Sequence, residues 1–238
     1  MKCLILAGGF ATRLYPLTIN KAKALIEYQG RPIISHIIDR IPPEMDILVS
    51  TNKKFENDFR EWQKTLGRSV EIGIEEALTD AQKKGAIGAV DYWIKAKNIT
   101  DDLLIIASDN YFEMDINDLI SRFNRRDPLI VVYDIGDKEK ACEIGKRCQL
   151  GLVITEGDRV IQFDEKPLTA TSSIISTGIY IFPAGLFPVL QQYCRDRQRD
   201  NLGSFIGYLL EKNGVRAYPL KGKWLDIGDE ILNGRLVV

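Results

Sequence analysis

Histidine is nearly absent from the sequence, since the 238-residue chain contains only His36. The four cysteines, Cys3, Cys142, Cys148 and Cys194, show neither a C-x-x-C pair nor another spacing typical of metal ligands. A zinc site built from histidine and cysteine is therefore nearly ruled out, and a Ser-His-Asp triad would have to use His36. The cysteines indicate reduced thiols, as in a cytoplasmic protein.

Long hydrophobic runs and an excess of one charge are also missing. No apolar run approaches the roughly 18 residues of a membrane-spanning helix. The apolar start, residues 1–7, is too short for a signal peptide. Because 32 Lys and Arg residues oppose 33 Asp and Glu residues, nucleic-acid binding through a broad basic surface is disfavoured. A local basic pocket for a phosphorylated small molecule stays compatible with this balance. We expect a cytoplasmic protein with no nucleic-acid or membrane partner.

The chain alternates short apolar runs with longer amphipathic ones, as in β-α-β units. We expect strands at residues 3–6, 46–50, 70–74, 103–107, 129–133, 151–155, 160–163, 174–182 and 215–220. We expect helices at residues 32–40, 54–65, 86–97, 115–124, 185–193 and 205–212. Strands of the second half are closer together, and no Gly/Ser-rich or Pro-rich linker separates the halves. These features predict one α/β domain over residues 1–238. Its sheet is expected to be Rossmann-like, doubly wound and mostly parallel, with a partly antiparallel second half.

A glycine-rich turn, Leu6-Ala7-Gly8-Gly9-Phe10-Ala11-Thr12-Arg13-Leu14, follows the first expected strand. Ligands of open α/β sheets bind beyond the carboxyl ends of the strands. Two glycines let backbone N–H groups approach phosphate oxygens, and Arg13 adds a fork of donors. The segment is neither a Walker A loop nor a G-x-G-x-x-G motif. By itself it is also compatible with a tight turn that carries a surface arginine.

An acidic residue, Asp109, ends another strand of the buried type, Leu103–Ala107. A carboxylate at this edge of the sheet is well placed to hold Mg²⁺ against substrate phosphates. The alternative is an aspartate that caps the next turn.

These segments together resemble a known family, the sugar-1-phosphate nucleotidyltransferases. The stretch Ala7–Thr18, followed by Lys23 and Pro32, is similar to the pattern G-G-x-G-T-R-L-x-P-x-T with its later lysine and proline. Four further motifs follow in family order: S-D-N at 108–110, F-x-E-K-P at 163–167, T-G-I-Y at 177–180 and W-x-D-x-G at 224–228. The resemblance covers about residues 2–230. It is nearest to thymidylyltransferase-like and small cytidylyltransferase-like members.

The resemblance implies the nucleotide-diphospho-sugar transferase fold, with a nucleotide-binding part at about 1–110 and a sugar-phosphate-binding part at about 111–230. It implies that the nucleotide is bound by Leu6, Ala7, Gly8, Gly9, Ala11, Thr12 and Arg13. It implies that the sugar phosphate is bound by Asn110, Gly151, Glu165, Lys166, Thr177 and Gly178. The implied catalytic residues are Arg13, Lys23 and Lys166. The implied cofactor is Mg²⁺, held by Asp109 and Asp226.

Several positions depart from the family pattern. Ala11 replaces a glycine, and we expect it to keep a negative φ and still present its N–H group. Glu27 replaces a proline and is expected to point away from the anionic ligand. Residues 74–81 should border the base but lack the glutamine of the thymidylyltransferases, and residues 201–206 lack their E-I-T-D. The base and the acceptor therefore stay open.

The implied reaction joins a nucleoside triphosphate (NTP) and a sugar 1-phosphate to give an NDP-sugar and pyrophosphate. A phosphate monoester is mostly dianionic at pH 7, so it can attack without a general base. We accordingly expect His36 to face solvent. One alternative is a cytidylyltransferase acting on a non-sugar phosphate such as phosphocholine. Others are a glycosyltransferase, for which no D-x-D motif is found near a strand end, and a non-catalytic module that binds sugar nucleotides. Assembly into a homo-oligomer is also left open.

Overall fold

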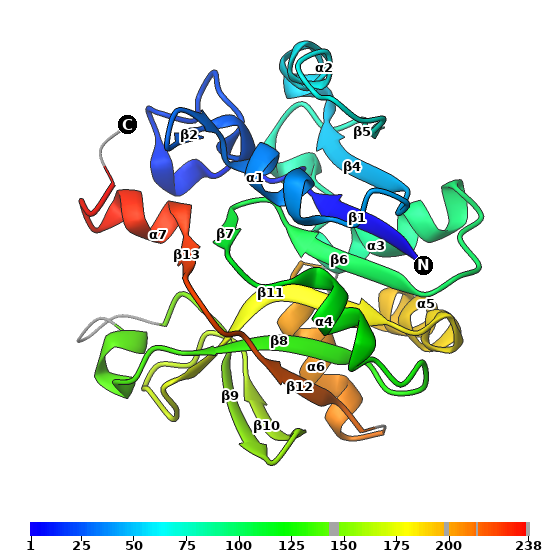
Figure 1. Cartoon of the computed structure of the whole chain (residues 1–238), viewed down its shortest axis with the longest axis vertical. Coiled ribbons are helices and arrows are strands. Elements are labelled where there is room, and N and C mark those ends of the chain that lie inside the picture. The colour runs from blue at the N-terminus through cyan, green and yellow to red at the C-terminus, as the bar shows by residue number, and fades with distance from the viewer. Residues whose placement is uncertain (143–147, 198–199, 213, 237–238) are drawn as a thin grey trace.

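The computed structural model describes residues 1–142, 148–197, 200–212 and 214–236. Its centre is one sheet whose strands lie in the order β5-β4-β1-β6-β11-β8-β12-β10-β9 (Figure 1). The strands are β1 (Lys2–Leu6), β4 (Ile47–Asn52), β5 (Glu71–Glu75), β6 (Leu103–Ala107), β8 (Leu129–Asp134), β9 (Leu152–Glu156), β10 (Arg159–Asp164), β11 (Ile174–Phe182) and β12 (Arg216–Pro219). Each overlaps one predicted strand, so all nine predicted strands are confirmed.

The first half of the sheet is parallel. β1 pairs with β4 and β6, and β4 pairs with β5, all in parallel register. Every residue of β4 is buried, and so is the run Leu103–Ile106 in β6. Continuous burial of this kind is typical of parallel strands that are covered on both faces. The carboxyl ends of these four strands meet at one edge of the sheet, where ligands of such folds bind.

The second half is mixed, as predicted. β11 is antiparallel to both β6 and β8, β12 is parallel to β8, and β9 and β10 form an antiparallel pair. The register of β11 against β8 is interrupted between Ser176 and Tyr180. Thr177 and Gly178 therefore lie at an irregularity of the strand, a feature that re-aims the chain locally.

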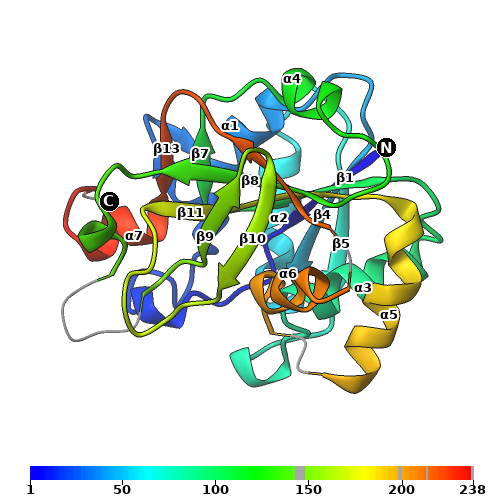
Figure 2. The same ribbon diagram turned by 90° about the horizontal axis from the view of Figure 1, so that it is seen from below.

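Helices cover both faces of the sheet, which confirms the doubly wound fold (Figure 2). One face is covered by α1 (Ile33–Arg40), α2 (Glu56–Gln63) and α4 (Ile116–Ser121), and the other by α3 (Ala86–Ala96), α5 (Phe187–Asp196) and α6 (Leu202–Leu210). All six were predicted. α6 begins earlier than expected because Asn201 caps it, its side chain accepting a hydrogen bond from Ser204 N at 2.8 Å.

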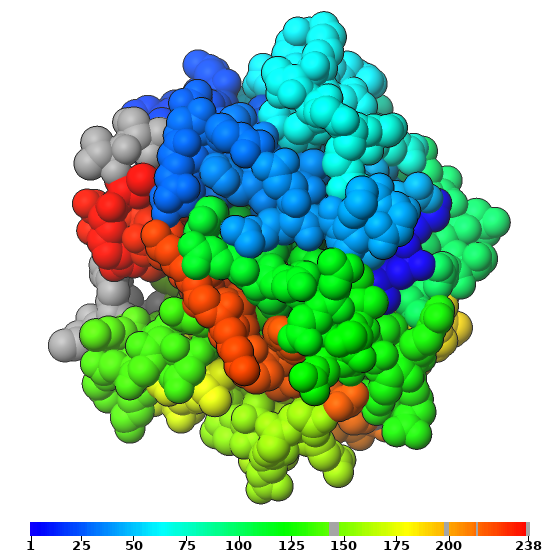
Figure 3. Space-filling view, in the orientation of Figure 1, coloured from blue at the N-terminus to red at the C-terminus, as the bar shows by residue number. Residues whose placement is uncertain are grey.

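Short elements outside the main sheet were not predicted. β2 (Glu27–Tyr28) pairs with β3 (Arg31–Pro32), and β7 (Asn110–Phe112) pairs with β13 (Trp224–Asp226). After β12 the chain crosses the front of the molecule, the orange segment of Figure 3, to reach β13 and then α7 (Ile227–Leu232). Strands of two or three residues are too short for hydrophobic periodicity to reveal.

The prediction of reduced thiols is wrong for one pair. Cys142 and Cys148 form a disulfide, while Cys3 and Cys194 are free and buried. The fold brings the Cα atoms of the bridged pair to 4.2 Å, a proximity that their spacing along the chain does not reveal.

Within the described residues, no helix is both long and apolar enough to cross a membrane.

Candidate functional site

A cavity of about 380 Å³ opens where the parallel strands end. The turn after β1, the ends of β5 and β6, and residues near the starts of α3 and α7 form its walls. Gln149 and Lys166 reach it from the second half of the chain. Of the residues that the sequence predicted for the site, those lining the cavity are Leu6, Ala7, Gly8, Gly9, Ala11, Arg13, Lys23, Asp109, Lys166 and Asp226.

The glycine-rich turn forms one wall of this cavity. Asn52 Nδ2 donates to the carbonyl of Gly8 at 3.1 Å, and the Thr18 hydroxyl donates to the carbonyl of Ala11 at 2.8 Å. Ala11 has φ 47° and ψ 45°, the left-handed conformation. The expectation of a negative φ at Ala11 is therefore wrong. The turn into the short helix Thr12–Leu14 requires a conformation that suits glycine, whereas the Cβ of alanine crowds the backbone there.

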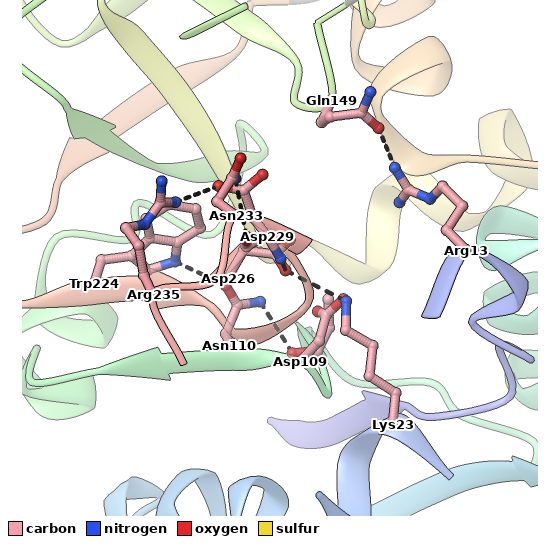
Figure 4. Close-up of polar contacts among 11 residues, drawn as sticks. Arg13, Lys23, Asp109, Asn110, Gln149, Trp224, Asp226, Asp229, Asn233 and Arg235 are labelled. Carbon is pink, nitrogen blue, oxygen red and sulfur yellow. Dashed lines mark hydrogen bonds and ion pairs between the residues drawn. The ribbon is translucent and has the colours of Figure 1, made fainter. Parts of the chain in front are cut away.

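The Lys23 side chain points between the carboxylates of Asp109 and Asp226 (Figure 4). Lys23 Nζ lies 2.7 Å from Asp109 Oδ2 and 3.3 Å from Asp226 Oδ1. The β7–β13 pair explains this convergence, since it sets Asn110 opposite Asp226 and so brings the chain next to Asp109. Gly228 makes the approach possible, because a Cβ at that position would collide with Lys23 Nζ.

Burial and charge act against each other in this cluster. Burial disfavours the charged form of Asp109, but the Lys23 ammonium outweighs it and holds the pKa of Asp109 below its usual range. Burial and the neighbouring charge of Asp109 raise the pKa of Asp226. Burial also opposes the charge of Lys23, yet the two carboxylates outweigh it and raise the pKa of Lys23 well above its ordinary value. A cation between the two carboxylates therefore stabilises both of them.

The same two carboxylates fit a magnesium ion. Among the described residues, no group of three or more His, Cys, Asp and Glu side chains could enclose a metal. Mg²⁺ rarely needs such a cage, because one or two carboxylates and the phosphates of a substrate commonly hold it. Asp226 Oδ1 already accepts hydrogen bonds from Lys23 Nζ and from Asp229 N, the latter at 3.0 Å. The donor set suits a metal that arrives with phosphate ligands.

Two further cations reach the cavity from separate parts of the chain. The guanidinium of Arg13 donates to Gln149 Oε1 (Figure 4). Lys166, which is half-buried, follows the end of β10 with φ 47°. A non-glycine residue in this conformation costs energy and is found preferentially at functional sites.

The remaining predicted site residues do not line the cavity; they are Thr12, Asn110, Gly151, Glu165, Thr177 and Gly178. Asn110 is tied into the scaffold, since its amide donates to the Ala107 carbonyl at 3.0 Å and accepts from Trp224 Nε1 at 2.7 Å. The Thr177 hydroxyl donates to the Val131 carbonyl at 3.0 Å. Asn110 thus fixes the chain directly after Asp109, and Thr177 ties β11 to β8.

Glu165 occupies a recess next to two glycines. A Cβ at Gly203 would collide with its carboxylate, and a Cβ at Gly151 would lie 3.2 Å from its Oε2. Burial raises the pKa of Glu165, while the adjacent Lys166 lowers it. Glu165 is therefore a partly desolvated acceptor adjacent to a cation of the cavity.

Glu75 lines the cavity but was not singled out within residues 74–81, which were expected to border the base. It ends β5, is 4% exposed and accepts a hydrogen bond from Ser50 Oγ at 2.6 Å. Burial raises its pKa, and the bond from Ser50 opposes this rise. The available signal was an acidic residue directly after the predicted strand 70–74.

His36 is half-buried rather than facing solvent, so that prediction is wrong. Its Nε2 lies 2.8 Å from the Tyr28 carbonyl oxygen, and its ring packs edge-on against Tyr28 and Tyr111. The unpredicted β2 and β7 supply these covering residues. Glu27 is exposed and does not line the cavity, in agreement with the expectation that it points away.

Comparisons with known proteins identify related sequences. A family model described as "Nucleotidyl transferase" matches residues 2–230. A "Putative mannose-1-phosphate guanyltransferase" of Sulfolobus acidocaldarius is 27% identical over 96% of this chain and 60% of its own. A "Bifunctional protein GlmU" of Methanocaldococcus jannaschii is 26% identical over 96% of this chain and 51% of its own. The chain thus spans between half and two thirds of the length of these curated relatives.

A solved structure has the same fold. The "Putative Glucose-1-Phosphate Thymidylyltransferase" of Bacillus anthracis superposes with a TM-score of 0.81 at 23% identity, covering 99% of this chain and 93% of that one.

The strained turn gives a first prediction. Ala11→Gly should raise the free energy of unfolding by about 1 kcal/mol, because glycine adopts the left-handed conformation without crowding by Cβ. Ala22→Gly is the matched control, since Ala22 has φ −64° and is buried, so it should lower stability. Urea denaturation measures both. A loss of stability in Ala11→Gly would contradict the assigned conformation.

The lysine between the carboxylates gives a second prediction. Removing one member of a fully buried ion pair costs roughly 3–5 kcal/mol. Because the three side chains keep 16–28% exposure, we expect Lys23→Met to lower stability in EDTA by about 2 kcal/mol. Mn²⁺ should recover part of that loss by binding the freed carboxylates.

Thermal unfolding with and without Mn²⁺ checks this outcome. Lys21→Met is the control, because Lys21 does not line the cavity. Equal effects of the two substitutions would contradict the structural role of Lys23.

Glu75 gives a third prediction, on pH. Its pKa is raised above the ordinary value of 4.5, so the folded state binds more protons than the unfolded state over the interval between the two pKa values. Stability should therefore fall as pH rises through that interval. Glu75→Gln removes this dependence, so the variant should gain stability relative to the parent as pH rises, with the difference constant above the folded pKa. Denaturation midpoints of the parent and of Glu75→Gln from pH 4 to pH 8 measure this difference in stability. If both midpoints changed with pH in the same way, the burial penalty on Glu75 would be contradicted.

Proposed function

Because the chain belongs to the nucleotidyl transferase family, we propose that it transfers a nucleoside monophosphate from an NTP to a sugar 1-phosphate. The products would be an NDP-sugar and pyrophosphate. The observation that carries this proposal is one cavity in which a glycine-rich turn, Arg13, Lys166 and the Lys23–Asp109–Asp226 cluster converge. Such a cavity offers cations and backbone donors to two phosphate-bearing substrates.

The chemistry of the acceptor explains the composition of the cavity. The attacking group is a phosphate oxygen, which is ionised near pH 7 without help from the protein. No histidine lines the cavity within the part of the chain that the structure describes. Catalysis then depends on in-line positioning and on stabilisation of the charge that shifts toward pyrophosphate.

Each cation has a proposed place along the reacting phosphates. Arg13, beside the glycine-rich turn, would hold the β- and γ-phosphates that leave as pyrophosphate. Lys166, at the end of β10, would orient the attacking phosphate. Lys23 would move from its carboxylate partners towards the α-phosphate. Mg²⁺ held by Asp109 and Asp226 would supply charge neutralisation across the phosphates.

The acceptor end of the site is proposed from Glu165. Its partly desolvated carboxylate next to Lys166 suits the hydroxyl groups of a sugar whose phosphate the lysine binds. The structure offers no observation that favours phosphocholine as the acceptor. A regulatory module without activity is disfavoured, since Arg13, Lys23, Lys166 and both aspartates are present.

The balanced charge supports small-molecule substrates rather than nucleic acid or a membrane as partners. A cytoplasmic location stays a prediction, and the disulfide between Cys142 and Cys148 is atypical of that compartment. Assembly into a homo-oligomer stays a prediction.

The separate roles of the cations can be tested by kinetics. Arg13→Ala should lower kcat/KM for the NTP by at least about tenfold, since one charge-assisted contact contributes roughly 1.5–3 kcal/mol. Lys166→Ala should do the same for the sugar phosphate and leave the KM of the NTP nearly unchanged. Lys64→Ala is a control, because Lys64 is exposed on the far end of α2 and outside the cavity.

Pyrophosphate release over a matrix of five NTPs and a panel of phosphate acceptors measures these effects. Release with no combination of substrates would overturn the proposed activity. Identical losses for both substrates in both variants would overturn the separate roles.

A further inference from the structure

Asn52 is a buried polar residue to which the proposed catalytic roles give no task. It ends β4 and is 0% exposed. Its Nδ2 donates to the Gly8 carbonyl at 3.1 Å, and its Oδ1 accepts from the Phe55 N–H at 3.2 Å. Because an amide nitrogen can only donate and an amide oxygen can only accept, a flipped side chain would satisfy neither contact. The two partners therefore fix one orientation of the Asn52 side chain.

A second contact joins the same two segments of the chain. Phe10, in the glycine-rich turn, and Phe55, shortly after β4, are both buried, and their ring centroids lie 6.2 Å apart. Aromatic pairs at this distance stabilise the elements that carry them. None of the residues from Asn52 to Phe55 lines the cavity. This segment therefore supports the turn from behind, through one hydrogen bond and one ring contact.

The hydrogen bond to the Gly8 carbonyl determines where the next N–H group points. The peptide bond between Gly8 and Gly9 is trans, so its carbonyl and its N–H point in opposite directions. Since the carbonyl faces Asn52, the Gly9 N–H points away from Asn52. Gly9 lines the cavity, and a Cβ built on it would meet no atom within 4 Å. The Gly9 N–H is therefore directed to the open side of the turn.

The N–H groups of the two glycines lack acceptors in the backbone. The Ala7 N–H still donates to the Ser50 carbonyl at 2.7 Å, as a continuation of the sheet. Among the described residues, neither Gly8 nor Gly9 donates a hydrogen bond to another backbone group. Phosphate oxygens are acceptors that commonly complete such consecutive backbone donors. The turn is thus held in a shape that offers its donors to an anion.

A peptide between two glycines needs an anchor of this kind. Glycine has no Cβ, so little steric hindrance opposes rotation of the Gly8–Gly9 peptide. A rotated peptide would direct the Gly8 carbonyl to the cavity, where its lone pairs would repel a phosphate. The Asn52 amide opposes this rotation, because it binds the carbonyl on the far side.

We propose that Asn52 is a positioning residue, which holds the Gly8–Gly9 peptide so that the Gly9 N–H meets a phosphate oxygen of the nucleotide. This inference rests on the proposed function, because it assumes that the turn binds the phosphates of an NTP. Asn52 itself would not touch the substrate.

Asn52→Ser tests this inference. Serine at this position also accepts a hydrogen bond from the N–H of the following helical turn, but its shorter side chain does not reach the Gly8 carbonyl. Calorimetry with ATP, GTP, CTP, UTP, dTTP and inorganic tripolyphosphate, with Mg²⁺ and no acceptor, measures the affinities. All six ligands should bind about tenfold more weakly, because one charge-assisted hydrogen bond is lost and the bases are not involved. The KM of an acceptor that supports pyrophosphate release should stay unchanged.

Two substitutions serve as controls. Thr51→Val is the matched neighbour, since the Thr51 hydroxyl is buried and has no hydrogen-bond partner within the described part of the chain. Ser35→Ala is the control for stability, because it leaves Trp62 Nε1, now 2.9 Å from Ser35 Oγ, without its buried acceptor. Thermal unfolding should show a loss of stability in Ser35→Ala. Both controls should bind tripolyphosphate as the parent does.

The Gly9 amide gives a readout that a merely structural role of Asn52 would not change. When the nitrogen-15-labelled parent is titrated with tripolyphosphate, the Gly9 amide proton should move downfield as it forms a hydrogen bond to an anion. At saturating tripolyphosphate this movement should be smaller in Asn52→Ser. If the variant does not fold, the Gly9 amide of the parent still decides, since a proton that does not move would overturn the inference.

Unchanged affinity for tripolyphosphate in Asn52→Ser would overturn the inference. An equal loss of affinity in Ser35→Ala would also overturn it, since lower stability alone would then explain the effect. A failure of the proposed function is distinguishable. In that case tripolyphosphate would bind with the stated dependence on Asn52, but no acceptor would give pyrophosphate.

Discussion

The ion cluster of Lys23 with Asp109 and Asp226 is the contact on which the arrangement of the cavity depends. It joins segments that are remote in sequence: the chain after the glycine-rich turn, the end of β6 and the start of α7. Asp109 and Asp226 repel each other across the ammonium that both contact, and a shared cation offsets this repulsion. The lysine fills that role in the protein alone, and a metal that arrives with the phosphates of a substrate would fill it in the complex. The cluster therefore holds these three segments together at the point where the chemistry proposed for the site would take place.

Much of the scaffold could be predicted because its signals are local. Continuous apolar runs identified the buried strands, and helical spacing identified α1 to α6. The β7–β13 pair could not be predicted, since three-residue strands carry no periodicity. That pair brings Asp226 to Asp109. Asp109 could be proposed from its place at a strand end, whereas Lys23 and Asp226 were predicted only through resemblance to a family. Their juxtaposition is a property of the fold.

Other differences arise from contacts that no single segment encodes. His36 is covered by Tyr28 and Tyr111, from short strands that the sequence did not indicate. The disulfide between Cys142 and Cys148 requires their Cα atoms to lie 4.2 Å apart, and the left-handed Ala11 follows from the turn into the next helix. Residue type and position within a helix predict how a side chain is exposed on an isolated element. They do not reveal the contacts that other segments of the chain add.

Energetically unfavourable features gather around the cavity. Ala11 and Lys166 have positive φ, Glu75 is a desolvated carboxylate, and Asp109 and Asp226 require a shared cation. The hydrophobic clusters that the helices form on both faces of the sheet provide the stability that tolerates them. The glycine-rich turn, Arg13, Lys23 and Lys166 bring backbone donors and positive charge to the cavity, and Asp109 and Asp226 bring negative charge that a metal could share. A ligand that carries phosphates matches this set of groups, which is the physical reason to connect the cavity with a nucleotide.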